Sequence, residues 1–154
     1  MAIISDEIKE LIQEKGTVKA LATISKSGEV NVTFKDHVEV DSDGNIVIYE
    51  LLDSSQSSKN LVYSLWFNKK VALSITSKDG IRYQVKGIPE RDIVTGPAYE
   101  EKYSEFILEN PENDLAGIWV IRPTEVREET YEVRLREERE KYPVIGHLDK
   151  DLAP

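Results

Sequence analysis

The chain of 154 residues has no cysteine and only two histidines, His37 and His147, which lie far apart in the sequence. Without cysteine it has no disulfide, thiolate zinc site, iron–sulfur cluster or cysteine nucleophile, and two distant histidines do not predict a metal site. Basic residues are also few, because 20 lysines and arginines stand against 29 aspartates and glutamates, a net charge of −9. A protein of this sign without a basic cluster repels phosphate groups, so neither nucleic acid nor an anionic membrane is an expected partner.

Long apolar runs are missing as well. No stretch approaches the roughly 20 apolar residues that span a membrane, and the first ten residues carry acids by position 6 instead of the apolar centre of a signal peptide. These features predict a cytoplasmic protein. With 40% hydrophobic and 32% charged residues, the chain is expected to fold around a core of its own.

The motifs of several common enzyme classes are absent too. No glycine pair has the spacing of a dinucleotide fingerprint or a P-loop, and no Gly-x-Ser-x-Gly sequence is present to expose a nucleophile. Residues 41–45 contain a glycine at the fourth position, where a calcium loop requires it at the sixth, so they predict a hairpin turn. Catalytic residues therefore remain unknown from the sequence, and no metal ligand is predicted.

What the sequence does contain is a regular alternation of helical and strand patterns. Ser5 followed by two acids predicts a helix start, and Gly16 predicts its end. From Thr17 the apolar period changes to two, which is typical of strands. The predicted strands are 17–25, 30–40, 45–52, 71–75, 81–87, 115–121 and 125–135, and two further helices are predicted at 58–67 and from Tyr99 to about residue 110.

This order of elements predicts a mainly β protein of the α+β type. The first three strands read as an antiparallel meander, and short turns or small helices join the later ones. An antiparallel closed or split barrel of six or more strands, with small flanking helices, protects the edges of such a sheet best. Residues 1–135 are expected to form this one domain, and residues 136–154 a charged C-terminal tail.

One polar segment, residues 54–60, stands out between a strand end and a helix start. Backbone N–H groups at a helix N-terminus bind anions, serine hydroxyls add donors, and Lys59 can supply charge. The alternative is a polar loop in which one serine caps the helix. The two interpretations are left open by the residues alone.

Three further side chains have both a structural and a functional interpretation. His37 is opposite in parity to Val38, so it is expected to point away from the face of Val30 to Val40, as a surface or interface residue. A histidine on a barrel strand can also touch a ligand at the barrel mouth. Trp66 and Trp119 are interpreted as core or dimer-contact residues rather than as cofactor-stacking ones.

Taken together, the chain from about residue 8 to 126 resembles the pyridoxamine-5′-phosphate oxidase-like family of FMN-binding split barrels. The matching features are the lead helix, the strand Ala20–Ile24, the turn with Gly28, the strand Asn31–Phe34, the turn at 43–45, the polar loop before Lys59-Asn60-Leu61, and the run at 68–73. The resemblance is to the family and not to pyridoxamine-phosphate oxidase itself. That enzyme has an arginine-rich C-terminal part, whereas residues 125–154 here are acidic overall.

The resemblance implies a homodimer with FMN at the interface between the two copies. It places Asn31, Val32, Thr33 and Phe34 along the isoalloxazine ring, and Leu51 at its edge. The polar loop would hold the phosphate through Ser54, Gln56, Ser57, Ser58 and Lys59. The family usually has an arginine or lysine where this chain has Ser57, so Lys19 and Lys35 are the candidates for the missing charge.

The function that follows is a flavoprotein, expected to be an oxidoreductase that passes electrons or hydride through FMN to a small substrate of unknown identity. One alternative is a non-catalytic binding or sensing module on the same barrel, with the FMN site weakened or lost, since such folds host several ligands. A third is an interaction protein whose charged segment 134–141 docks on a partner as a helix.

Overall fold

The computed structural model describes residues 3–143, so His147 and the end of the predicted tail lie outside the described residues. Seven strands and four helices form within this part of the chain. In chain order they are α1 (Asp6–Gln13), β1 (Val18–Ile24), β2 (Val30–Phe34), β3 (Val38–Val40), β4 (Ile46–Glu50), α2 (Gln56–Phe67), β5 (Val71–Thr76), β6 (Arg82–Ile93), α3 (Pro97–Glu109), β7 (Gly117–Glu128) and α4 (Tyr131–Lys141).

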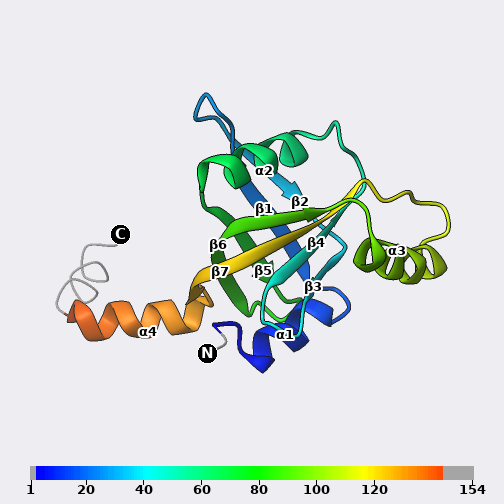
Figure 1. Ribbon diagram of the computed structural model, residues 1–154. Coiled ribbons are helices and arrows are strands. Elements are labelled where there is room, and N and C mark those ends of the chain that lie inside the picture. Colours follow the sequence, from blue (N-terminus) through cyan, green and yellow to red (C-terminus); the bar gives the residue numbers. More distant parts are fainter. Residues whose placement is uncertain (1–2, 144–154) are drawn as a thin grey trace.

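The strands form one curled antiparallel sheet with the order β2-β1-β5-β6-β7-β4-β3 (Figure 1). The predicted mainly β split barrel with small flanking helices is therefore confirmed. The two longest strands, β6 and β7, pair over most of their length, with register shifts at Lys86/Gly87 and Pro89/Arg91. Such irregularities increase the local bend and twist, which helps the sheet to curl.

The predicted meander is wrong in its middle strand. Residues 30–40 form two strands, β2 and β3, that lie at opposite ends of the sheet order. The backbone N–H of Lys35 still bonds to Lys19 of β1, whereas two residues later the carbonyl of His37 accepts from Tyr49 of β4. The chain thus leaves one edge of the sheet and joins the other at Asp36, a residue type that is depleted in strands.

The C-terminal elements also differ from the prediction. A single strand, β7, replaces the two predicted at 115–121 and 125–135, and the helix α4 follows it directly. Pro123 does not break β7, because it lies opposite Gly87 at a register shift, where the hydrogen-bond ladder is already interrupted. Helix formation over 134–141 is confirmed, and α4 runs across residue 135, the predicted boundary of the tail. The division into a domain of 1–135 and a tail of 136–154 stays a prediction.

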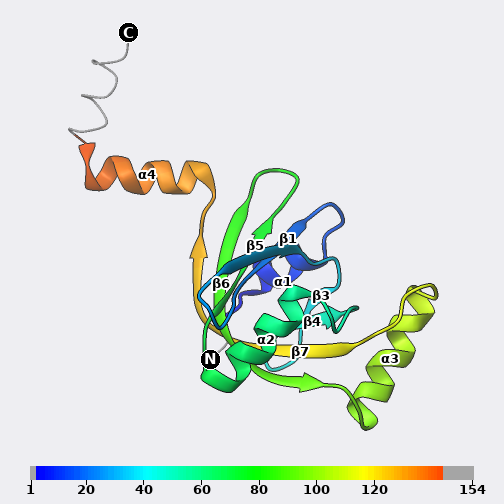
Figure 2. The same ribbon diagram turned by 90° about the horizontal axis from the view of Figure 1, so that it is seen from above.

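The helices occupy different sides of the barrel. α1, capped by Ser5 as predicted, and α2 lie at opposite ends of the curled sheet (Figure 1). α4 projects away from the sheet beyond β7 (Figure 2), and no residue of α4 is buried. None of the described helices is long and apolar enough to cross a membrane.

The core fills the concave side of the sheet, and its burial fixes which face of each strand points inward. Trp119 is buried there, whereas Trp66 on α2 is 78% exposed. In β1 the buried residues are Leu21 and Thr23, while Ala20 and Ala22 are only half-buried and face the other way. A second, smaller cluster forms under α3. The two clusters are built around Leu21, Ile48, Leu61, Ile75 and Trp119, and around Val47, Phe106, Leu115 and Ile118.

Candidate functional site

The polar loop ends where Ser55 caps α2. Its backbone is extended (φ −65°, ψ 151°), and its Oγ accepts a hydrogen bond from the backbone N–H of Ser58 at 3.1 Å. This is the geometry of an N-cap serine. The capping interpretation of the loop is therefore confirmed, with Ser55, which was not among the predicted binding residues, as the cap.

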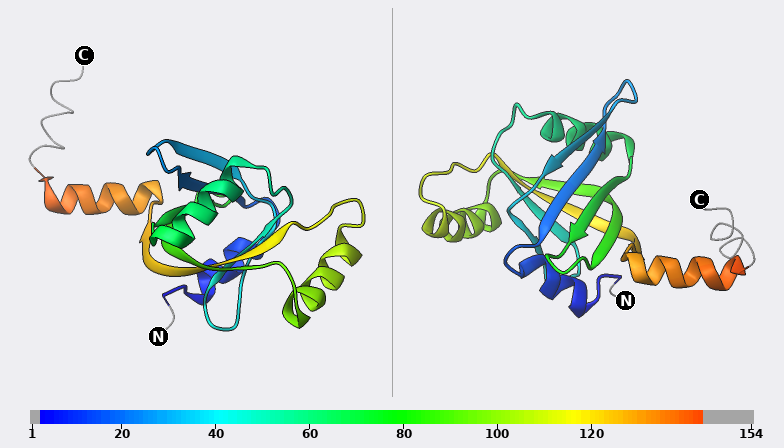
Figure 3. Two further views of the ribbon diagram at one scale, coloured as in Figure 1. Left: turned by 45° about the horizontal axis from the view of Figure 1, so that its top comes forward. Right: turned by 180° about the vertical axis from the view of Figure 1, so that it is seen from behind.

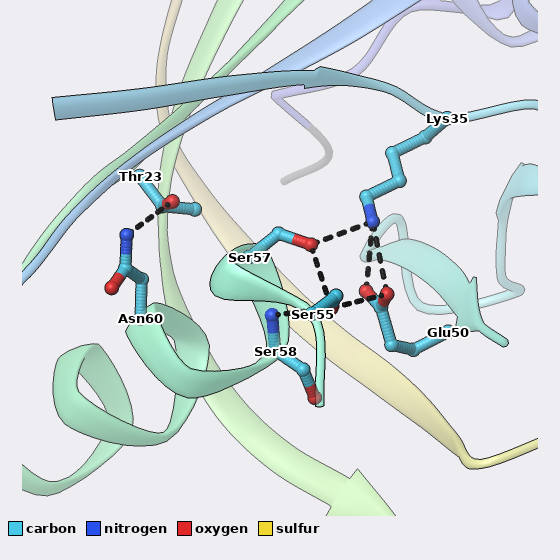
Figure 4. A network of polar contacts seen from close by, with 7 residues as sticks. All are labelled: Thr23, Lys35, Glu50, Ser55, Ser57, Ser58 and Asn60. Carbon is cyan, nitrogen blue, oxygen red and sulfur yellow. Dashed lines mark hydrogen bonds and ion pairs between the residues drawn. The ribbon is translucent and has the colours of Figure 1, made fainter. Parts of the chain in front are cut away.

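A buried ion pair lies directly beside this helix start (Figure 4). The Nζ of Lys35 is 2.9 Å and 3.1 Å from the two carboxylate oxygens of Glu50, and the two side chains are 11% and 5% exposed. The same Nζ donates to the Oγ of Ser57 at 2.8 Å. Sequence reasoning identified Lys35 as a candidate charge but missed Glu50. The sequence feature that could have indicated Glu50 is its position at the end of the apolar run of β4, where a side chain is expected to be buried.

The hydroxyl groups around the ion pair complete one connected network. Ser55 Oγ donates to Glu50 Oε1 at 3.0 Å, and the hydroxyls of Ser55 and Ser57 are 3.2 Å apart. Since the single proton of Ser55 goes to Glu50, Ser57 is the donor in the bond between the two serines. All three side-chain donors thus direct their protons toward one carboxylate.

The electrostatic surroundings of the network are acidic. Burial and, to a smaller extent, the nearby carboxylates of Asp53 and Glu50 together raise the pKa of Asp92 on β6 to about 6, against a backbone hydrogen bond from Ile118. Lys19, the second candidate charge, is not at the loop. Its Nζ donates to the backbone carbonyls of residues 12 and 36 at 3.4 Å and 3.5 Å, and burial lowers its pKa.

Two polar side chains of β2 face the concave side of the sheet, toward α2. In the β1–β2 pair, Asn31 lies opposite Thr23 and Thr33 lies opposite Leu21. Because directly paired residues point to the same face, both side chains share the face of Leu21 and Thr23. On that face Thr23 accepts a hydrogen bond from Asn60 of α2 at 3.0 Å. Asn31 Nδ2 and Thr33 Oγ1 are buried, and neither has a hydrogen-bond partner within residues 3–143. Buried polar atoms are rarely left unpaired, so these two call for an explanation.

The other predicted site residues lie in several places. Val32 and Phe34 point to the opposite face of β2 and are exposed. Leu51 packs with the cluster under α3. Ser57 and Ser58 are buried at the start of α2, whereas Ser54, Gln56 and Lys59 are exposed.

The cavity that holds His37 lies elsewhere. It has a volume of about 390 Å³ and is enclosed by α1, β3 and α3. His37 is half-buried there, edge-to-face with Phe106 of α3 at a ring-centroid distance of 5.0 Å. Lys19 also lines this cavity, whereas the residues predicted to contact the ring and the phosphate loop do not.

Comparison with known proteins adds a fold-level match. No protein-family model and no curated protein matches the sequence. Among solved structures, HupZ from Group A Streptococcus is 16% identical, with a TM-score of 0.68 over 84% of this chain and 96% of that one. A protein from Lactobacillus delbrueckii described as a putative pyridoxamine 5′-phosphate oxidase is 17% identical (TM-score 0.63, 80% and 93% covered). An FMN-binding protein from Syntrophomonas wolfei is 15% identical (TM-score 0.61, 79% and 82% covered).

This chain has the fold of the FMN-binding split barrels. The resemblance inferred from the sequence is thereby confirmed at the level of the fold. Within this split barrel the structure brings Lys35 to the start of α2, where the family resemblance predicts a charge. It also pairs that charge with Glu50, which sequence reasoning missed.

Proposed function

We propose that this split barrel is a homodimeric flavin-binding protein and acts as an oxidoreductase that passes electrons or hydride through the flavin, predicted to be FMN, to a small substrate. The observation that carries the proposal is the pair of unpaired polar atoms on β2, Asn31 Nδ2 and Thr33 Oγ1. They lie on the strand that the family resemblance places along the isoalloxazine ring. The fold-level similarity to an FMN-binding protein supports the same ligand class.

The chemistry of the two side chains fits the polar edge of a flavin. The amide of Asn31 can donate to a ring carbonyl, and the hydroxyl of Thr33 can donate or accept. A buried polar group without a partner costs about 1–3 kcal/mol, which a bound ring would recover. The flavin supplies the redox chemistry when bound, so the chain needs only to orient the ring and hydrogen-bond to it.

The opposite face of the same strand supports the homodimer. Val30, Val32 and Phe34 are 80%, 63% and 73% exposed, and they pair with Ile24, Ala22 and Ala20 of β1. Figure 3 shows that none of the described helices covers this side of β1 and β2. A sheet that is apolar on both faces normally has both faces covered. A second copy of the chain is the partner that we propose for the outer face.

The dimer is tested by placing charge on that face. Phe34→Glu is expected to convert the protein to a monomer, because a charge buried in an apolar interface is left without a partner. Size-exclusion chromatography with light scattering measures the mass. Leu108→Glu on α3 is the matched control, because Leu108 is 84% exposed outside this face and its replacement is expected to leave the mass unchanged. A Phe34→Glu protein that remains a dimer contradicts the assignment of the interface.

Flavin binding is tested by the visible absorption of the purified protein, before and after titration with FMN. Flavin bands at one per chain support the proposal, and a colourless protein that ignores flavin overturns it. Thr33→Val is expected to weaken binding by about 1 kcal/mol, roughly fivefold, through loss of one hydrogen bond. Thr124→Val is the control, because that hydroxyl bonds to the backbone of Lys86 in β6. Equal affinities of the two variants would remove Thr33 from the site.

A second function is favoured by the ion pair of Lys35 and Glu50. Because the predicted charge of the phosphate site is neutralised within the chain, the protein could instead be a non-catalytic binding or sensing module that has lost FMN. The titration above separates the two functions.

A further inference from the structure

Within the network at the start of α2, the side chains of Lys35, Ser55 and Ser57 have no donor left for an anion. Lys35 has three N–H groups, and its Nζ contacts three acceptors: both oxygens of Glu50 and the hydroxyl of Ser57. The protons of Ser57 and Ser55 run through the network to Glu50. A phosphate at pH 7 can only accept hydrogen bonds from such groups, and it carries up to two negative charges.

An incoming phosphate would also have to displace Glu50. The carboxylate is buried, and removing Lys35 from it leaves an unpaired charge away from water, which is strongly unfavourable. Asp92 lies close enough to both Glu50 and Asp53 to be repelled by them, so a further anion there would add repulsion. A ligand tail that ends in hydroxyl groups meets neither obstacle, because a hydroxyl can donate to a carboxylate as well as accept.

We propose that Glu50 is a specificity-determining residue that makes the loop at 54–59 select a flavin whose tail ends in a neutral hydroxyl, riboflavin, over one that ends in a phosphate, FMN. The inference rests on the proposed flavin-binding function and refines the identity of its ligand. Glu50 acts by holding the charge of Lys35 and the protons of the serine hydroxyls, so that they do not bind a phosphate.

The experiment compares the affinities of riboflavin and FMN, each measured by quenching of flavin fluorescence on titration with the protein. We expect the wild-type protein to bind riboflavin at least about tenfold more tightly than FMN. In Glu50→Gln the amide keeps the shape of the side chain but releases the charge of Lys35. FMN binding is then expected to gain about tenfold relative to riboflavin.

Two further variants show whether the released lysine is the cause. The double variant Lys35→Gln/Glu50→Gln removes both buried charges, so it should fold even if Glu50→Gln does not, and its preference for riboflavin is expected to stay close to that of the wild type. Glu125→Gln makes the same change in net charge at an exposed position, 3.9 Å from Lys86, and is expected to leave the preference unchanged. Melting temperatures verify that each variant is folded.

The possible failures are distinguishable. If neither flavin binds to the wild-type protein, the proposed function itself is overturned and this inference falls with it. If flavins bind but FMN binds as tightly as riboflavin, only the selectivity assigned to Glu50 is overturned. A Glu50→Gln variant that is folded and keeps the wild-type preference overturns it as well.

Discussion

Replacing Asp92 by asparagine is expected to stabilise the protein at neutral pH and to have no such effect in acid. Asp92 lies on β6 beside the network at the start of α2, and one of its carboxylate oxygens, Oδ1, is buried without a hydrogen-bond partner in the described part of the chain. Burial, followed by repulsion from Asp53 and Glu50, raises its pKa to about 6. The folded protein therefore disfavours the charged form of this side chain.

The sign and size of the effect follow from the pKa. Below the unfolded value, near 3.8, both states hold the proton and Asp92 does not affect stability. Between there and about pH 6 the folded state keeps a proton that the unfolded state loses, so stability falls as the pH rises. The full shift corresponds to at most about 3 kcal/mol. Because the side chain is only partly buried, solvent screening reduces the expected gain of Asp92→Asn at pH 7–8 to about 1 kcal/mol.

Urea unfolding of both proteins between pH 4 and pH 8 measures this difference. The stabilities should diverge as the pH rises from 4 to 6 and then run parallel. Asp79→Asn, an exposed position in the turn after β5, makes the same change in net charge and reports the effect of charge alone. A gain of equal size at pH 4 and pH 8, or a loss at pH 8, would refute the reasoning.

Two further predictions concern the packing of the barrel. Lys35→Met leaves Glu50 buried without its partner and is expected to destabilise the fold by about 3–5 kcal/mol, most of which returns when Glu50→Leu is added. Urea unfolding of the single and double variants measures this, and an equally unstable double variant would contradict it. In Gly87→Ala the added Cβ would lie 2.6 Å from a main-chain oxygen of β7. We expect a loss of about 2 kcal/mol or more; an unchanged melting temperature would show that the two strands move apart easily.

Several elements could be predicted because their signals are local. The cap at Ser5, the two-residue period of β1 and β5, and the polar stretch before α2 each depend on neighbours within one or two turns of chain. Their order was enough to indicate an antiparallel split barrel, since sheet edges must be paired or covered. The same local signals located the loop in which Ser57 meets a lysine.

Which residues meet across the barrel was decided only by the tertiary structure. Apolar and polar residues alternate in 30–40 in the same way whether the chain forms one strand or crosses at Asp36 from one edge of the sheet to the other. The separation of β2 from β3 therefore had no sequence signal. In β1 both faces are apolar enough to be core, and it is the covering of one face by α2 that buries Leu21 and Thr23. Lys35 and Glu50 are 15 residues apart and belong to different edges of the sheet order. The sequence by itself determined the hydroxyl groups near a helix start and offered several lysines as the cation. Which lysine lies there, and its pairing with a buried carboxylate, depend on contacts between distant segments, which only the closing of the barrel creates.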